Sequence, residues 1–308
     1  MPSFRRKRVG RAVGVAAFTL LTCVLVTVAS AGSHAQSNQG AEAPPPLVPL
    51  RLLGVGVGGG VQDFAIDAGF YARRGLAVQL ERFLGGPVVA TAAAAGGKAD
   101  MGEYGTPILT GVSLGLPMKI VGSPPIKGPS SELVARKGIE TVADLRGKVV
   151  AAGALGSGPH QAVLWILHAN GLDEKTDVNV VSSGGIDAEM VLRSGRVDAV
   201  ITGGLTRLKL IDEGHGNMIA DVRNYYGRHQ HNYVYATDDF IKNHPQAIRA
   251  YFLATRDSLE YAKAHVDELI GYTGSRIKVR KELIRAYYAE QIPQWDLSFR
   301  IDLEGTLM

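Results

Sequence analysis

A glycine-rich turn at the start of a predicted helix carries the clearest binding chemistry in the sequence. The turn is Gly156-Ser157-Gly158, and Pro159 and His160 follow it. Free backbone N–H groups and the positive end of a helix dipole make such a turn a receptor for anions. Ser157 adds a hydroxyl donor and His160 a ring nitrogen. We therefore expect Gly156, Ser157 and His160 to contact a ligand, with a plain strand-to-helix turn as the alternative.

Five further residues are candidates because they lie in loops at the ends of predicted strands. Ligands of open parallel sheets bind beyond the carboxyl ends of the strands. Gly59 and Gln62 belong to an earlier glycine turn that corresponds to the one at Ser157. Tyr104 can stack on a planar ligand, with packing at the sheet rim as the alternative. Thr106 and Thr202 complete the expected site.

Two motifs could suggest a cofactor or a metal, and neither is sufficient. Gly54–Gly59 fits the G-x-G-x-x-G pattern of dinucleotide-binding proteins, and Glu81 lies after the next strand. That motif is weak alone, and the corresponding second turn lacks it. His229 and His231 could share one face of an extended segment, but no third ligand stands near them in the sequence. We predict no cofactor and no metal site.

The N-terminus has the pattern of a secretory signal peptide over residues 1–35. An apolar run, Ala12–Val28, follows a basic segment, and Ser33-His34-Ala35 is a small-x-small cleavage pattern. A retained membrane anchor is the alternative. Cys23, the single cysteine, lies in this segment and leaves lipid anchoring open. The mature chain then has no thiol, so nucleophilic cysteine chemistry is excluded. No Ser/His/Asp order or carboxylate pair stands out, and we predict that the protein is not an enzyme.

The charge of the chain also depends on this segment. Of the 33 basic and 29 acidic residues, residues 1–35 hold five basic and no acidic ones. The mature chain therefore has 28 basic residues against 29 acidic, a net charge of −1. Such a balance gives no reason to expect a nucleic-acid partner. Residues 36–48 are polar and then proline-rich, which is typical of a disordered tether.

The chain beyond the tether contains an internal repeat with a spacing near 98 residues. Four landmarks return in order: Gly97-Lys98-Ala99-Asp100 as Gly195-Arg196-Val197-Asp198, Gly85-Gly86 as Gly184-Gly185, Gly75-Leu76 as Gly171-Leu172, and Gly58-Gly59-Gly60 as Gly156-Ser157-Gly158. Each copy fits strand-helix-strand-helix-strand. In the first copy, apolar residues from Val61 to Ala72 recur at helical spacing and predict one helix. The repeat therefore predicts an α/β protein with two mostly parallel sheets flanked by helices.

Several segments resemble the substrate-binding proteins of ABC importers for nitrate, sulfonate, taurine and thiamine precursors. These stretches are Gly69–Val78, Gly97–Gly102, Thr141–Val150, Ser194–Val200 and Phe240–Pro245. That family has the periplasmic-binding-protein type 2 fold. The resemblance implies a hinge at two crossing strands near Leu133–Arg136 and Tyr233–Ala236. One departure is Thr202-Gly203-Gly204-Leu205, where many members have a Trp-Glu-Pro-like segment.

The resemblance gives the remaining expectations. Lobe 1 comprises residues 49–132 and 233–308, and lobe 2 comprises residues 133–232. A small molecule, such as an organic anion or a small heterocycle, is captured between the lobes and passed to a permease in the inner membrane. The protein is expected to be periplasmic or otherwise extracytoplasmic and monomeric. A ligand-binding sensor subunit and a non-transport enzyme of the same fold are the alternatives.

Overall fold

The computed structural model describes residues 46–54, 59–82, 95–105, 107–126, 131–183, 188–225, 227 and 229–307. The predicted signal peptide, Cys23, residues 36–45 of the tether, the Gly-Gly turns of the repeat and Thr106 lie outside the described residues. Residues Pro45–Met308 form one compact unit. No helix within the described residues combines the length and apolar character that crossing a membrane requires.

The first of two five-stranded sheets has the order β2-β1-β3-β10-β4. Strand β10 runs antiparallel to both of its neighbours, and the other four strands share one direction. Val48, placed in the tether by the sequence, is the first residue of β1 and pairs with Leu76. The strands are β1 (Val48–Gly54), β2 (Leu76–Arg82), β3 (Met101–Gly105), β4 (Met118–Gly122) and β10 (Asn232–Thr237).

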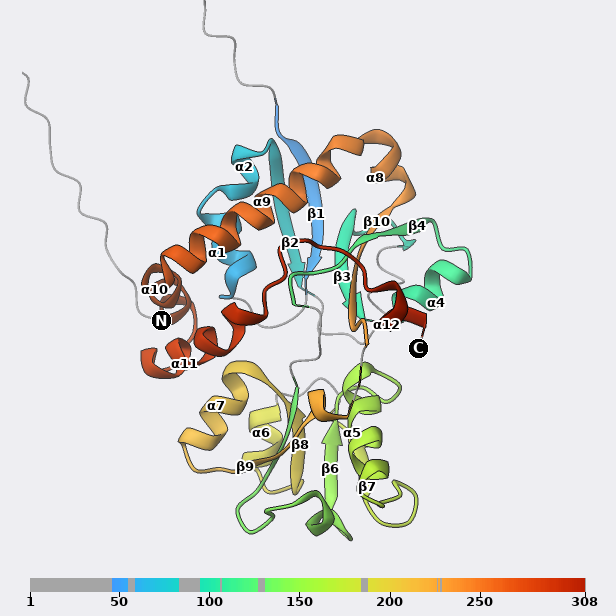
Figure 1. Cartoon of the computed structure of the whole chain (residues 1–308), viewed down its shortest axis with the longest axis vertical. Helices are drawn as coiled ribbons and strands as arrows, with labels where there is room; N and C mark the ends of the chain where they lie inside the picture. The colour runs from blue at the N-terminus through green and yellow to red at the C-terminus, as the bar shows by residue number, and fades with distance from the viewer. Residues whose placement is uncertain are drawn as a thin grey trace, which may run out of the picture. The chain divides into compact units, whose positions relative to one another are not determined.

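The second sheet repeats this arrangement with the order β7-β6-β8-β5-β9. Here β5 is the antiparallel strand, between β8 and β9. The chain thus passes from one sheet to the other twice, and the strand that it forms after each passage, β5 or β10, lies between two other strands of its sheet (Figure 1). The α/β prediction of two mostly parallel sheets is confirmed. The strands are β5 (Glu132–Ala135), β6 (Val149–Ala152), β7 (Asn179–Ser182), β8 (Ala199–Thr202) and β9 (Asn217–Asp221).

We call residues 46–126 and 229–307 the first half, and residues 131–225 the second half. Strands β5 and β10 begin at Glu132 and Asn232, one residue before the expected lobe boundaries. The first half contains α1 (Val61–Asp67), α2 (Phe70–Arg73), α4 (Pro107–Ser113), α8 (Asp238–Asn243), α9 (Pro245–Ala264), α10 (Val266–Arg276), α11 (Lys281–Gln291), the 3₁₀ turn Ile292–Gln294 and α12 (Leu303–Leu307). The second half contains α5 (Gly158–Ala169), α6 (Ala188–Arg193), α7 (Gly204–Asp212) and the 3₁₀ turns Val142–Leu145 and Val222–Asn224.

The repeated Gly-Lys/Arg-x-Asp turn has the same structural role in both halves. Asp100 Oδ2 accepts a hydrogen bond from the backbone N–H of Arg51 at 2.7 Å, and Asp198 Oδ2 accepts one from that of Val149 at 2.8 Å. Both partners lie 49 residues earlier in the chain. Each aspartate therefore ties the start of the third strand of its copy to the first strand.

The first predicted helix is interrupted, which corrects the expectation of one helix from Val61 to Ala72. Helix α1 ends at Asp67 and α2 begins at Phe70. Gly69 between them has φ 75°, in the left-handed region where glycine is favoured and a right-handed helix cannot continue. The apolar spacing survives the break, so Phe64 and Tyr71 still pack into the same core.

The two faces of the first sheet carry separate cores, and this separation decides which side chains reach the ligand site. On one face, Met101 and Val234 pack with residues of α1, α2, α9, α10 and α11. On the other, Tyr233 and Tyr235 pack with α4. Successive side chains of a strand point to opposite faces. Neighbours along β3 therefore enter different environments.

Candidate ligand-binding site

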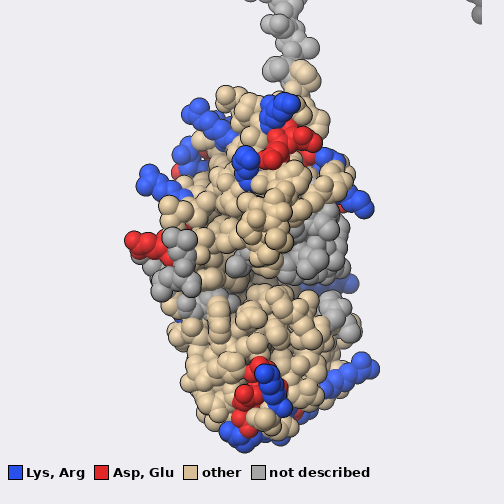
Figure 2. Space-filling model, turned by 90° about the vertical axis from the view of Figure 1, so that its right-hand side faces the viewer, with Lys and Arg blue, Asp and Glu red and all other residues tan. Residues whose placement is uncertain are grey.

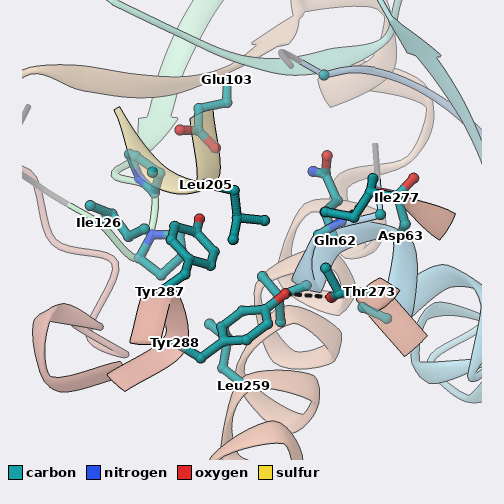
Figure 3. A pocket seen from close by; sticks show the side chains of 18 of the residues that line it. Gln62, Asp63, Glu103, Ile126, Leu205, Leu259, Thr273, Ile277, Tyr287 and Tyr288 are labelled. Atoms are coloured by element: carbon teal, nitrogen blue, oxygen red, sulfur yellow. Dashed lines mark hydrogen bonds between the residues drawn. The ribbon is translucent and has the colours of Figure 1, made fainter. Parts of the chain in front are cut away.

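A cavity of about 760 Å³ lies between the two halves. The first half supplies the carboxyl ends of β1 and β2, part of β3, and residues of α1, α9, α10 and α11. The second half supplies Glu189 of α6 and five residues at the start of α7, which are Gly203, Gly204, Leu205, Thr206 and Lys209. Figure 3 shows Glu103, Leu205 and Tyr287 on one side of this cavity and Gln62, Asp63 and Ile277 on the other. In Figure 2, the charged side chains visible on the face shown gather toward its two ends, and few are drawn in the band between the halves.

Glu103 of β3 is one of three half-buried carboxylates that line this cavity, with Asp63 and Glu189. Its side chain lies on the same sheet face as Met101, two residues earlier, and its register partner is Val234. Burial raises the pKa of the Glu103 carboxyl from 4.5 to about 7, because desolvation disfavours the charged form. No hydrogen bond or ion pair joins it to another described residue.

Two cationic side chains of the cavity are held by neighbouring carboxylates. Arg82 Nη2 lies 2.6 Å from both carboxylate oxygens of Asp63. Lys209 Nζ lies 2.8 Å from both oxygens of Glu189. Lys278 also borders the cavity, and its side chain is exposed. The two pairs reduce the positive potential that Arg82 and Lys209 would otherwise present to a ligand.

Aromatic and hydroxyl side chains form much of the remaining wall. The rings of Tyr71 and Tyr251 stack with centroids 5.7 Å apart, and the Tyr71 hydroxyl lies 3.0 Å from Thr255 Oγ1. The hydroxyls of Tyr288 and Thr273 are 2.8 Å apart (Figure 3). Burial raises the pKa of Tyr71 to about 12, so this phenol stays protonated at neutral pH. Leu205, Leu259 and Ile277 give the wall its apolar surface.

Helix α7 and helix α11 join the two halves beside the cavity. Arg207 of α7 is buried, pairs with Glu290 of α11, and places Nε 3.6 Å from Glu132 Oε2. Burial raises the pKa of Glu132 to about 7, although the charge of Arg207 partly opposes this shift. A second pair joins Asp212 at the end of α7 to Arg280, the residue directly before α11. Ion pairs therefore hold the halves together on this side.

Of the eight residues expected to bind ligand, Gly59 and Gln62 line the cavity. Gly59 lies shortly before α1 and has φ 78°, a backbone conformation that favours glycine. The chain can therefore bend sharply at this residue before the helix begins. Thr202 ends β8, directly before the lining residue Gly203, and pairs with Glu132. Tyr104 lies outside this cavity, because it points to the other face of the sheet and packs near Tyr235.

The turn at Gly156, Ser157 and His160 also lies outside this cavity. Ser157 precedes α5 and is 7% exposed, and its Oγ has no hydrogen-bond partner among the described residues. His160 Nδ1 accepts a bond from the Gly156 N–H at 3.2 Å. A Cβ at Gly158 would lie 3.4 Å from His231 Cε1, so the start of α5 faces the segment that returns to the first half. Ligand contact at this turn stays a prediction.

Glu103 is the residue that sequence reasoning missed. It directly precedes Tyr104, which was selected instead from the sequence as the candidate at this strand end. Strand parity could have found it: Met101 and Glu103 share a face, and a carboxylate on the core face of a strand is rarely placed there without a role. Among the described residues, no group of three or more His, Cys, Asp or Glu side chains is placed to hold a metal ion.

Solved structures with the same fold are binding proteins of ABC importers, among others. The alkanesulfonate-binding protein SsuA from Xanthomonas axonopodis pv. citri, bound to MOPS, has a TM-score of 0.66 at 17% identity, covering 82% of this chain and 85% of its own. The periplasmic nitrate-binding protein NrtA from Synechocystis PCC 6803 has 0.64 at 15% identity, covering 77% and 69%. DszB in complex with biphenyl-2-sulfinic acid has 0.57 at 18%, covering 83% and 88%. These likenesses establish the periplasmic-binding-protein type 2 fold.

The sequence itself matches the family model described as NMT1/THI5 like over residues 64–269, more than half of the chain. No curated protein matches it at the sequence level. The chain belongs to the NMT1/THI5-like family. The resemblance to this group of importer proteins is confirmed.

Proposed function

We propose that this protein is an exported solute-binding protein, which captures a small organic molecule between its halves and delivers it to an ABC import permease. The observation that carries the proposal is the cavity of about 760 Å³, because both halves contribute side chains to its wall. A ligand that contacts both walls binds the closed arrangement better than an open one and shifts the population toward it. The two crossing strands, β5 near Leu133–Arg136 and β10 near Tyr233–Ala236, act as the hinge, as the family resemblance implies. The protein works as a monomer outside the cytoplasm.

The size of the cavity favours an organic ligand over a bare inorganic ion. Ligand pockets usually measure about 300–1,000 Å³, and this cavity of about 760 Å³ lies within that range. An ion of a few atoms would leave most of the apolar wall at Leu205 and Leu259 in contact with water. A ligand with an apolar body covers that wall.

The cavity is better suited to binding than to catalysis. Its described lining contains no histidine and no cysteine, the residue types that most often serve as general bases or nucleophiles. Thr255 and Ser258 direct their hydroxyls to backbone carbonyl groups of α9. The enzyme alternative rests on DszB, an enzyme of the same fold, and on the Glu103 carboxyl, whose pKa suits a general base.

A carried ligand tests the proposal directly. The mature protein is purified without denaturation and examined by native mass spectrometry, with Leu205→Trp as the blocking variant. Leu205 projects into the cavity from the second half, so an indole there occupies the ligand space (Figure 3). We expect the wild-type protein to carry or bind a small molecule that Leu205→Trp excludes, and to become more compact in small-angle scattering when saturated.

The matched control is Leu114→Trp, because Leu114 is 79% exposed and does not border the cavity. This variant should keep the ligand. Equal ligand occupancy in Leu205→Trp would refute this cavity as the binding site. The released ligand is also compared by mass with the molecule supplied. A changed mass would establish the enzyme alternative, and a radius of gyration that stays constant at saturation would contradict closure.

A further inference from the structure

The geometry of β3 places one carboxylate in the ligand cavity while its neighbours serve the fold. Gly102 lies beneath Tyr235, whose hydroxyl would be 2.6 Å from a Cβ at that position, so a larger residue there would have to displace the Tyr235 ring. Tyr104 packs on the same face as Tyr235. Met101 fills the core on the opposite face. Glu103 shares the face of Met101 but lies beyond the core, at the cavity wall (Figure 3).

Glu103 differs from the other half-buried carboxylates of this cavity because no cationic side chain among the described residues pairs with it. Asp63 is paired with Arg82, and Glu189 is paired with Lys209. Within the part of the chain that the structure describes, the titratable groups that interact with Glu103 are the phenols of Tyr71 on α2 and Tyr251 on α9, and both are neutral at physiological pH. A buried carboxylate without a partner is costly unless a ligand supplies one.

We propose that the ligand presents an amino or ammonium N–H group to Glu103 and rests its apolar body on Leu205, Leu259 and Tyr287. This inference rests on the proposed function, because it assigns chemistry to the same cavity. Ionised carboxylates accept short, strong hydrogen bonds from cationic N–H donors. The ligand thus gives Glu103 a cationic partner. Arg82 and Lys209 already have this role for the other two carboxylates, Asp63 and Glu189.

The opposite chemistry is a purely anionic ligand, and the cavity disfavours it. An anion near Glu103 would be repelled by the ionised carboxylate and could approach only when that carboxyl is protonated. Arg82 and Lys209 would first have to exchange Asp63 and Glu189 for the ligand. Lys278 remains at the exposed border, where an anionic group at the far end of an amine-bearing ligand could still lie.

The experiment compares two probes of similar shape and opposite charge, 2-phenylethylamine and 3-phenylpropionate, by isothermal titration calorimetry. The amine should bind and the carboxylate should not. Because the folded protein holds the Glu103 proton up to a pH of about 7, amine binding at about pH 6 should release most of one proton, and binding at about pH 8 almost none. Titrations in buffers of different ionisation enthalpy measure this release.

The decisive variant is Glu103→Gln, with Glu282→Gln as its control on the exposed first turn of α11. Glu103→Gln should weaken amine binding by about tenfold to a hundredfold, the worth of a charged hydrogen bond, and abolish proton release. The control should match the wild type. Tighter binding of the carboxylate, or unchanged amine affinity in Glu103→Gln, would overturn the inference but leave the proposed function intact. If the wild-type protein binds neither probe and carries no molecule after purification, both the inference and the proposed function are overturned.

Discussion

Replacing Glu103 by glutamine should stabilise the ligand-free protein, although it damages the binding site. The carboxyl has a pKa of about 7 in the folded protein against 4.5 as its ordinary value. The folded protein therefore binds the proton more tightly than the unfolded chain does. By linkage, stability falls as pH rises from about 4.5 to about 7 and stays reduced above that range. Glutamine has no charge to desolvate, so the variant avoids this loss.

The size of the effect follows from the shift in pKa. A shift of this size corresponds to about 3 kcal/mol at about pH 8, where the carboxyl is ionised, and to less than about 1 kcal/mol at about pH 5. Glu103 is only half-buried, so water in the cavity lowers the cost, and we expect about 1–3 kcal/mol at about pH 8. For a chain of this size, that gain raises Tm by about 2–8 °C.

The assay is thermal unfolding of the ligand-free wild type, Glu103→Gln and Glu282→Gln at about pH 5 and about pH 8. The gain in Tm should be present at the higher pH and nearly absent at the lower one. A gain of equal size at both values would show that the amide acts through packing instead of through charge. A loss at about pH 8 would show that the ionised carboxylate has a stabilising partner, and the reasoning about Glu103 would be refuted.

Three other substitutions test the remaining parts of the structure. Arg207→Met leaves Glu132 buried without its cation, so we expect a loss of about 3 kcal/mol at about pH 8 that shrinks at about pH 5, where Glu132 is protonated; thermal unfolding at both values measures it. Glu290→Ala removes the half-exposed partner of Arg207 across the halves, which should favour opening by less than about 1 kcal/mol and slightly enlarge the ligand-free radius in scattering. Asp198→Ala removes the bond from the Val149 N–H, so it should cost about 1–2 kcal/mol in urea unfolding and leave ligand affinity unchanged.

The internal repeat made most of the fold predictable, because its repeated residues fix the conformation or the hydrogen bonds of the backbone. Gly97 and Gly195 adopt φ near 70°, and the aspartates three residues later bind main-chain groups. Such positions tolerate few residue types, so they remain visible in the sequence. Helix α10 was not predicted, because Gly271, Thr273 and Gly274 within it have a low helix propensity and weaken the helical pattern.

The residues of the ligand site were less predictable than the fold. Whether a turn at the end of a strand borders the cavity depends on tertiary packing, which the repeat pattern does not describe. The turns before α1 and α5 are related by the repeat, and Gly60 and Ser157 occupy matching positions before the two helices. Only the first turn borders the cavity, since the start of α5 faces the segment near His231 instead. The internal repeat shows that the two turns are alike in sequence. It does not predict the long-range packing that gives each turn different neighbours.

Residues that hold the sheets differ from residues that line the cavity, and this difference explains how one fold serves different ligands. The relatives of known structure share the architecture at identities of 15% and 17%, and their names describe the binding of nitrate and alkanesulfonate. Positions such as Gly97 and Asp198 hold the sheets, whereas the side chain of Glu103 makes no hydrogen bond or ion pair with another described residue. A side chain of the second kind can change without unfolding the protein, and here it is a carboxylate that weakens the ligand-free state. Its presence in the cavity wall is best explained by a ligand that pairs with it.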